Sequence, residues 1–187
     1  MINLKVIIAS TRPGRKGPSL ASWMFEKARI SPGFNTELLD LAEINLPFLD
    51  EPEHPRFQKY HHDHTKKWSS MIDSADAFIF VTPEYNYGYP APLKNALDYL
   101  YNEWNYKPVA FVSYGGVSGG TRSVQMLKQV VTAQKMVPVV EAVNVPFFTK
   151  YINGQGEFIP DEPIQKGAEL MLKELLKWAE NLKLMRR

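Results

Sequence analysis

Three runs of apolar residues constrain the fold of this chain more than any other feature. Residues 4–9, 76–82 and 107–114 are apolar at nearly every central position, which indicates strands that are covered on both faces. Between these runs, apolar residues recur at helical spacing, as they do over 20–28. Strands that alternate with helices predict a parallel sheet joined by right-handed crossovers, with helices on both faces.

The order of the elements predicts a five-stranded α/β domain that is doubly wound. Beyond the three runs, we expect strands over 36–41 and 136–143 and helices over 20–30, 66–74, 92–101, 119–134 and 161–183. At 187 residues, the chain has the usual size of one domain, so we expect a single domain over 1–187. An open sheet with the strand order 2-1-3-4-5 holds its ligand beyond the carboxyl ends of the strands, between strands 1 and 3.

The composition excludes several kinds of catalytic site and binding partner. The chain has no cysteine, which excludes a disulfide framework, a thiolate metal site and a cysteine nucleophile, so any redox chemistry requires a cofactor. A formal net charge of +2, with the basic residues dispersed, does not favour a nucleic-acid partner. No apolar run is long enough to cross a bilayer, and the first residues lack the pattern of a secretory signal. We therefore expect a cytoplasmic protein without a membrane partner.

The loop after the first strand, residues 10–19, has the residue types of a phosphate site. It opens a helix, and a helix N-terminus offers free N–H groups and the positive end of the helix dipole. The hydroxyls of Ser10, Thr11 and Ser19 can donate hydrogen bonds, and Arg12 has a planar cation that suits phosphate oxygens. The loop matches neither the Walker motif nor the dinucleotide fingerprint. The competing interpretation is that its serine and glycine residues only cap the helix.

The loop after the third strand suits a flat aromatic ligand with polar edges. It runs from Pro83 to Pro90, with two prolines that limit its freedom, a glycine at Gly88 that permits unusual backbone angles, and three tyrosines near Asn86. Glu84 is a candidate general base. We expect instead that this carboxylate pairs with a cation or caps backbone amides.

Four segments together resemble the NADPH-dependent FMN reductase family, the flavodoxin-like group that includes quinone, azo-dye and chromate reductases. These segments are residues 10–15 after the first strand, 82–86 after the third, 90–98 in the following helix and 113–116 after the fourth. The resemblance covers residues 4–145 by the order and spacing of elements, and 82–86 is its most specific motif. One departure is Ala9, where many relatives have glycine.

The resemblance implies a flavodoxin-like fold, a bound FMN, and NADPH or NADH as the electron donor. The FMN phosphate would lie in the first loop, with the ring along the loops after strands 3 and 4. The implied cofactor-binding residues are Ser10, Thr11, Arg12, Gly17, Pro18, Ser19, Pro83, Glu84, Tyr85, Asn86, Tyr87, Ser113, Tyr114, Gly115 and Gly116. The two glycines after strand 4 would let the main chain approach the pyrimidine side of the ring.

The resemblance also implies the reaction. Hydride passes from NAD(P)H to the flavin, the spent nucleotide leaves, and a quinone, azo compound, metal oxyanion or flavin takes the electrons in the same place. Because the flavin carries the chemistry, we assign no catalytic side chain. The alternative is a flavodoxin-type electron carrier or flavin-binding protein without turnover. Such carriers are usually strongly acidic, whereas this chain is slightly basic.

Residues 42–65 form the one long stretch without a strand or helix pattern, which predicts a functional or interface loop. The stretch contains all four histidines, His54, His61, His62 and His64. We expect no metal site, because their spacing matches no established motif, and we expect the loop to lie over the flavin edge or against a partner subunit. The dense aromatic residues between positions 85 and 106 favour a homodimer, with a tetramer as the alternative.

Overall fold

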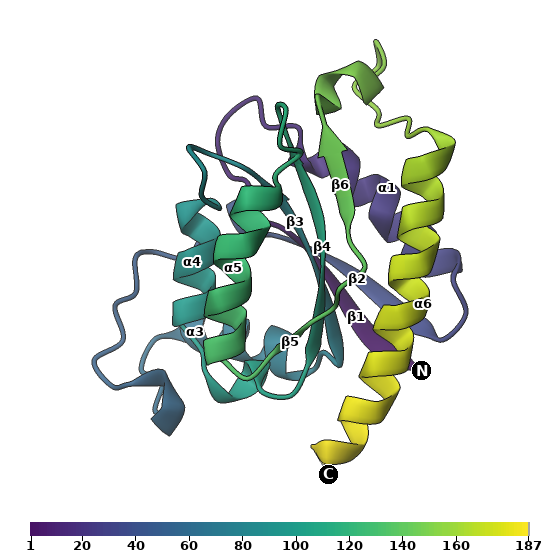
Figure 1. Ribbon diagram of the computed structural model, residues 1–187. Coiled ribbons are helices and arrows are strands. Elements are labelled where there is room, and N and C mark those ends of the chain that lie inside the picture. The colour runs from purple at the N-terminus through teal and green to yellow at the C-terminus, as the bar shows by residue number, and fades with distance from the viewer. Residues whose placement is uncertain (187) are drawn as a thin grey trace.

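The computed structural model describes residues 1–186 and shows a parallel sheet between two layers of helices (Figure 1). The strands are β1 (Ile2–Ile8), β2 (Phe34–Asp40), β3 (Ala77–Pro83), β4 (Pro108–Gly115), β5 (Val137–Pro138) and β6 (Val143–Pro146). Their order is β2-β1-β3-β4-β5, and β6 also pairs with β4. Each of these pairings is parallel. The predicted fold class and strand order are therefore confirmed.

The fifth strand is interrupted, so the prediction of one continuous strand there is wrong. β5 and β6 both pair with β4, at Val109–Pro138 and at Val112–Val143. From Val109 to Val112, β4 advances by three residues, whereas the chain paired with it advances by five, from Pro138 to Val143. The two extra residues bulge out of the strand pairing. Pro138 stands at the break, because a proline has no N–H to donate to a neighbouring strand.

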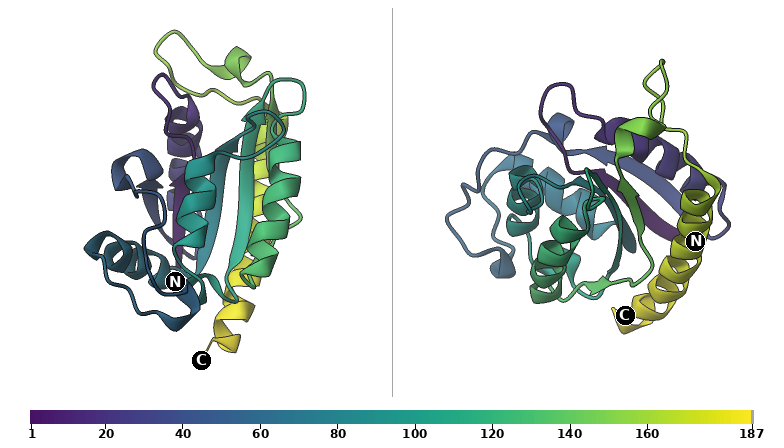
Figure 2. Two further views of the ribbon diagram at one scale, coloured as in Figure 1. Left: turned by 90° about the vertical axis from the view of Figure 1, so that its left-hand side faces the viewer. Right: turned by 45° about the horizontal axis from the view of Figure 1, so that its top comes forward.

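The longer helices cover both faces of the sheet. Figures 1 and 2 show one layer made by α1 (Gly17–Ile30) and α6 (Glu162–Met185), and the other made by α3 (Asp63–Asp73), α4 (Ala91–Asp98) and α5 (Thr121–Ala133). The predicted helices are confirmed, although α1 and α3 each begin three residues earlier than expected and α4 ends three residues earlier. The short helices are α2 (Leu41–Ile44), η1 (Pro55–Phe57), η2 (Asn102–Trp104) and η3 (Phe148–Tyr151). Among the helices of residues 1–186, none is long and apolar enough to cross a membrane.

Alternate residues of each central strand enter two separate cores. In β1, Val6 and Ile8 pack in the core beneath α1 and α6, whereas Ile7 packs with Trp68 and Trp104 on the opposite side. Each of these five side chains is at most 2% exposed. This burial on both faces explains why the strand runs are apolar at nearly every central position.

The long stretch between α2 and α3 is fixed in place by side chains of α4 and of the segment that follows it. The Asn95 side-chain oxygen accepts a hydrogen bond from the Leu49 amide at 3.0 Å. The Tyr99 hydroxyl lies 3.0 Å from a carboxylate oxygen of Asp50. The buried Glu103 accepts a 2.8 Å hydrogen bond from the hydroxyl of Tyr60. The stretch therefore packs beside α3 and α4, at the left of Figure 1.

Candidate functional site

The loops that follow β1, β3 and β4 meet in a crevice of about 270 Å³ at the carboxyl ends of these strands. The three strands are neighbours in the sheet, so the loops that leave them are neighbours too. The crevice is lined by Arg12, Arg15, Lys16, Pro83, Glu84, Tyr85, Tyr114, Gly115, Gly116 and Phe148. Seven of these residues belong to the predicted cofactor-binding set, namely Arg12, Pro83, Glu84, Tyr85, Tyr114, Gly115 and Gly116.

One end of the crevice is cationic and lies at the start of α1. Lys16 is the N-cap of α1 but makes no capping hydrogen bond with its side chain, and the first turn contains no acidic residue. Within residues 1–186, neither Arg12 nor Lys16 forms an ion pair, whereas Arg15 is held by two contacts of 2.5 and 2.6 Å to Asp40. Free cations beside an uncapped helix N-terminus suit an anionic group.

Ser10, at the start of this loop, does not line the crevice but contacts Tyr114, which does. Its side chain is fully buried, and its hydroxyl oxygen accepts a 3.2 Å hydrogen bond from the Tyr114 hydroxyl. Burial is the main reason that the pKa of Tyr114 is raised to about 12, so the phenol stays protonated as a donor. A Cβ at Gly17 would lie 2.4 Å from Ser10 Oγ, so the close approach of α1 requires glycine here.

Pro18 and Ser19 face a different part of the surface. The Ser19 hydroxyl donates a 2.6 Å hydrogen bond to the carbonyl oxygen of Gly156. Both residues line a separate cavity beside Trp23. Thr11 is half-buried and does not line the crevice. The structure thus brings Arg12 to the crevice but not the side chains of Thr11, Pro18 and Ser19.

The loop after β3 is a tight hairpin. Tyr85 and Gly88 exchange two backbone hydrogen bonds of 2.9 Å, and the two residues between them have positive φ, 49° at Asn86 and 72° at Tyr87. Tyr85 lines the crevice, whereas Asn86 and Tyr87 lie at the exposed tip. Buried Pro83 completes this wall.

The loop after β4 forms the opposite wall with its backbone. A Cβ at Gly116 would meet no atom within 4 Å, so the main chain is open to a flat ligand at this point. Ser113 does not line the crevice, because its buried hydroxyl donates a 2.8 Å hydrogen bond to the Gly119 carbonyl oxygen. The Glu84 amide donates to the Tyr114 carbonyl oxygen at 3.1 Å, which joins the two walls.

The prediction that Glu84 pairs with a cation or caps backbone amides is confirmed, and the carboxylate does both. Its carboxylate forms a 2.5 Å ion pair with Arg122 and accepts a 3.2 Å hydrogen bond from the Arg122 amide. Burial by itself raises the pKa of Glu84, but hydrogen bonds from Arg122 and Ser118 outweigh it, so the pKa of this carboxyl lies below its usual range. A carboxyl that remains ionised in an ion pair is a poor proton acceptor.

Sequence reasoning missed Arg15, Lys16 and Phe148. Arg15 and Lys16 belong to the predicted phosphate loop, and their charge beside Arg12 was the available signal. Phe148 lies far along the chain in η3, and its ring contacts the Tyr114 ring edge to face at 5.0 Å between centroids. No local pattern marks such a residue, because only the pairing of β6 with β4 brings it to the crevice.

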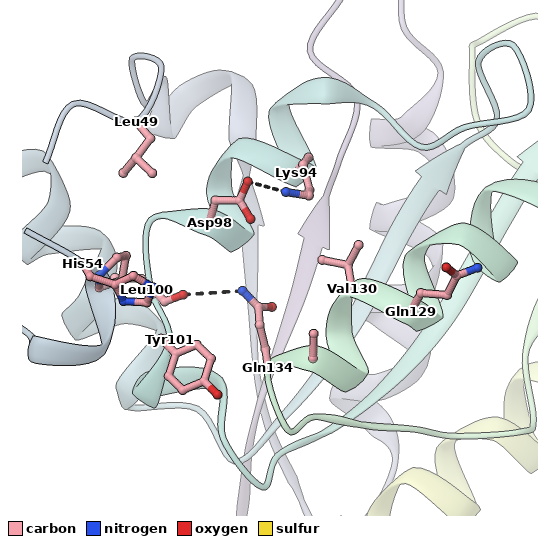
Figure 3. Close-up of a pocket in the computed structure, with 11 residues that line it drawn as sticks. Leu49, His54, Lys94, Asp98, Leu100, Tyr101, Gln129, Val130 and Gln134 are labelled. Atoms are coloured by element: carbon pink, nitrogen blue, oxygen red, sulfur yellow. Dashed lines mark hydrogen bonds and ion pairs between the residues drawn. The ribbon is translucent and has the colours of Figure 1, made fainter.

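A larger groove of about 600 Å³ lies elsewhere, between α4, α5 and the stretch before η1 (Figure 3). The groove is lined mainly by apolar surface, with a 2.5 Å Lys94–Asp98 ion pair on its wall. Of the four histidines, His54 alone lines it. Residues 42–65, all of which the structure describes, contribute nothing to the smaller crevice. Within residues 1–186, no cluster of three or more metal-ligating side chains occurs.

The crevice fits the FMN that the sequence resemblance implies. Its cationic end, with Arg12 and Lys16 at the start of α1, matches a phosphate. Its other end, with Tyr85 and the open backbone at Gly116, matches a flat ring with polar edges. Both chemical requirements of the cofactor are met within one site.

The comparisons with known proteins agree with this fit. A sequence model of the family described as NADPH-dependent FMN reductase matches residues 2–150. An NAD(P)H-dependent FMN reductase of Schizosaccharomyces pombe is 46% identical over 145 residues, which cover 75% of this chain and 72% of that protein. An NADPH:quinone oxidoreductase of Arabidopsis thaliana is 36% identical over 102 residues, or 53% of this chain and 50% of that protein.

A solved structure shows the same fold. The flavoenzyme NAD(P)H:(acceptor) oxidoreductase FerB from Paracoccus denitrificans matches with a TM-score of 0.75 at 23% identity, over 97% of this chain and 98% of that one. The chain therefore belongs to the NADPH-dependent FMN reductase family, whose members are oxidoreductase enzymes that use FMN and NAD(P)H.

Proposed function

We propose that the protein is an FMN-dependent NAD(P)H oxidoreductase that passes two electrons, in a ping-pong reaction, from NAD(P)H to a quinone, azo compound, metal oxyanion or free flavin. The observation that carries this proposal is the crevice, which joins free cations at the start of α1 to an aromatic and glycine surface. Family membership supports the cofactor and the donor, and the Arabidopsis relative supports a quinone acceptor.

Within this site, we assign the phosphate to Arg12, Lys16 and the first N–H groups of α1, with Ser10, Thr11, Gly17, Pro18 and Ser19 shaping the loop around it. Tyr85 and the backbone of Gly115 and Gly116 would hold the ring, with Pro83, Asn86, Tyr87, Ser113 and Tyr114 supporting these two walls. Bound FMN would supply the two-electron chemistry. The residues bind and orient it, and they leave one ring face accessible to the donor and then to the acceptor.

Spectroscopy and initial rates test this proposal. Purified protein, or flavin-free protein after addition of FMN, should show flavin absorbance that NADPH bleaches without oxygen and that a quinone then restores. Double-reciprocal plots at several quinone concentrations should be parallel, as a ping-pong reaction requires. Colourless protein that ignores added FMN would contradict the proposal. Flavin that binds but gives no turnover with any small acceptor would favour the electron-carrier alternative.

We further propose that the enzyme works in the cytoplasm as one domain over residues 1–187 and as a homodimer. Support for a dimer comes from the apolar groove between α4 and α5, beside which Phe48 is 86% exposed and Leu49 is 42% exposed. Large exposed apolar side chains around a groove are typical of a contact surface. Light scattering after size exclusion should give twice the mass of one chain, 21.4 kDa. A monomer at micromolar concentration would contradict this.

A further inference from the structure

The hairpin after β3 has a tip that its own sequence does not favour. Two-residue hairpins with positive φ at both central residues prefer Asn-Gly, but here the second residue is Tyr87, with a φ of 72°. A side chain in this left-handed region crowds the following carbonyl oxygen. Contacts from outside the hairpin must therefore stabilise Tyr87 in this conformation.

Arg122, in the first turn of α5, makes those contacts. The centre of its guanidinium group lies 3.9 Å from the centroid of the Tyr87 ring. The Nε and Nη2 atoms of the same group lie 2.6 and 2.5 Å from Oε1 of Glu84. A cation stacked on one residue and paired with another fixes both of them relative to α5.

Glu84 joins the hairpin to the start of α5 a second time. Its Oε2 accepts hydrogen bonds from the Ser118 hydroxyl at 2.8 Å and from the Arg122 amide at 3.2 Å. Gly120, the N-cap of α5, has no side chain for this task, so Glu84 supplies the cap. The Glu84 side chain is only 6% exposed and lines the crevice. Without Arg122, an unpaired carboxylate would face the site of an anionic cofactor.

We propose that Arg122 is a positioning residue for FMN binding, which holds Tyr85 in the crevice through the hairpin and neutralises Glu84 on the crevice wall. Arg122 itself does not line the crevice, so it acts through these residues rather than by touching the cofactor. The inference rests on the proposed function and adds a residue that none of the sequence motifs singled out.

A double-mutant cycle tests the proposal on flavin-free protein. Arg122→Gln should raise the Kd for FMN about 10- to 100-fold, because it leaves a buried carboxylate unpaired. The double variant with Glu84→Gln should bind FMN more tightly than Arg122→Gln alone, since the unpaired charge is gone. The matched control is Arg29→Gln, which breaks a 2.6 Å ion pair with Glu26 on the exposed face of α1. This control should keep the Kd within about twofold.

The pH profile separates this role from a merely structural one. For Arg122→Gln, the ratio of its Kd to that of the wild type should fall as the pH is lowered from 7.5 to 5, because protonation removes the unpaired charge of Glu84. Arg122→Lys, which keeps a cation, and the double variant should show a constant ratio. The other titratable or charged groups around the crevice and the hairpin contain no carboxyl and no histidine; they are Arg12, Arg15, Lys16, Tyr85, Tyr87 and Tyr114. A constant ratio for Arg122→Gln would overturn the proposed neutralisation.

Amide hydrogen exchange of flavin-free protein gives a readout that does not depend on FMN. The amides of Tyr85 and Gly88 should exchange at least about tenfold faster in Arg122→Gln than in the wild type, since the hairpin opens more often. Wild-type protein that binds no FMN would contradict the proposed function, while the exchange rates would still decide whether Arg122 holds the hairpin. If the wild type binds FMN but Arg122→Gln changes neither the Kd for FMN nor the exchange rates, the inference about Arg122 is overturned and the proposed function is not.

Discussion

Replacing Gly17 by alanine is the substitution whose cost the structure defines most closely. The new Cβ would lie 2.4 Å from Ser10 Oγ and 2.8 Å from the Tyr114 hydroxyl. Ser10 is 0% and Tyr114 is 3% exposed, so neither can move into solvent. Overpacking of a buried site costs about 1–3 kcal/mol, and loss of the Ser10–Tyr114 hydrogen bond adds about 1 kcal/mol. We expect a destabilisation of about 3 kcal/mol.

Thermal unfolding of flavin-free protein measures this cost without any contribution from cofactor binding. For a chain of this size, a loss of about 3 kcal/mol should lower the Tm by roughly 6–12 °C. Gly167→Ala is the matched control, because this glycine lies inside α6 and its Cβ would meet nothing within 4 Å. The control should gain about 0.5–1 kcal/mol from the better helix propensity of alanine. A Gly17→Ala protein that unfolds within 2 °C of the wild type would show that α1 does not pack on Ser10 as described.

Three further substitutions probe other parts of the molecule. Arg12→Gln should raise the Kd for FMN by roughly tenfold at low salt. It should leave the Tm of flavin-free protein unchanged, since the side chain is exposed. An unchanged Kd would remove Arg12 from the phosphate site. Burial raises the pKa of Asp76, but hydrogen bonds from Lys183 and the Asn3 amide outweigh it and lower that pKa in the folded protein. The stabilisation from Asp76 is therefore present above about pH 4 and lost below it. Asp76→Asn should flatten the acid limb of a plot of unfolding free energy against pH. An acid limb as steep as that of the wild type would contradict this prediction. Val130→Arg, in the groove between α4 and α5, should convert a dimer into a monomer in light scattering, and a dimer that persists would place the interface elsewhere.

The sheet could be predicted from the sequence because its central strands are buried on both faces. Such strands read as runs that are apolar at nearly every central position, as β1, β3 and β4 do. The interruption of the fifth strand was harder to predict, because the run from Met136 to Val143 is also largely apolar. The bulge between β5 and β6 depends on their register against β4. The start of α3 was also missed, because the residues from Asp63 to Thr65 are polar and carry no apolar spacing.

For the candidate site, the sequence indicated the loops better than the individual side chains. The loops after β1, β3 and β4 were expected at one edge, because parallel strands bring their carboxyl ends together. Which side chains line the crevice depends on contacts between segments far apart in sequence. Ser19 bonds to Gly156, Arg122 bonds to Glu84, and Phe148 packs on Tyr114. None of these contacts has a signal within its own segment.

The affinity of flavin-free protein for FMN relative to riboflavin tests the site assignment most directly. The two molecules differ only in the phosphate, which we assign to Arg12, Lys16 and the N-terminus of α1. A fluorescence titration at low salt should show that FMN binds at least about 100-fold more tightly than riboflavin, because several charge-assisted hydrogen bonds depend on the phosphate. Equal affinity for the two flavins would contradict the assignment of the cationic end of the crevice as the phosphate site.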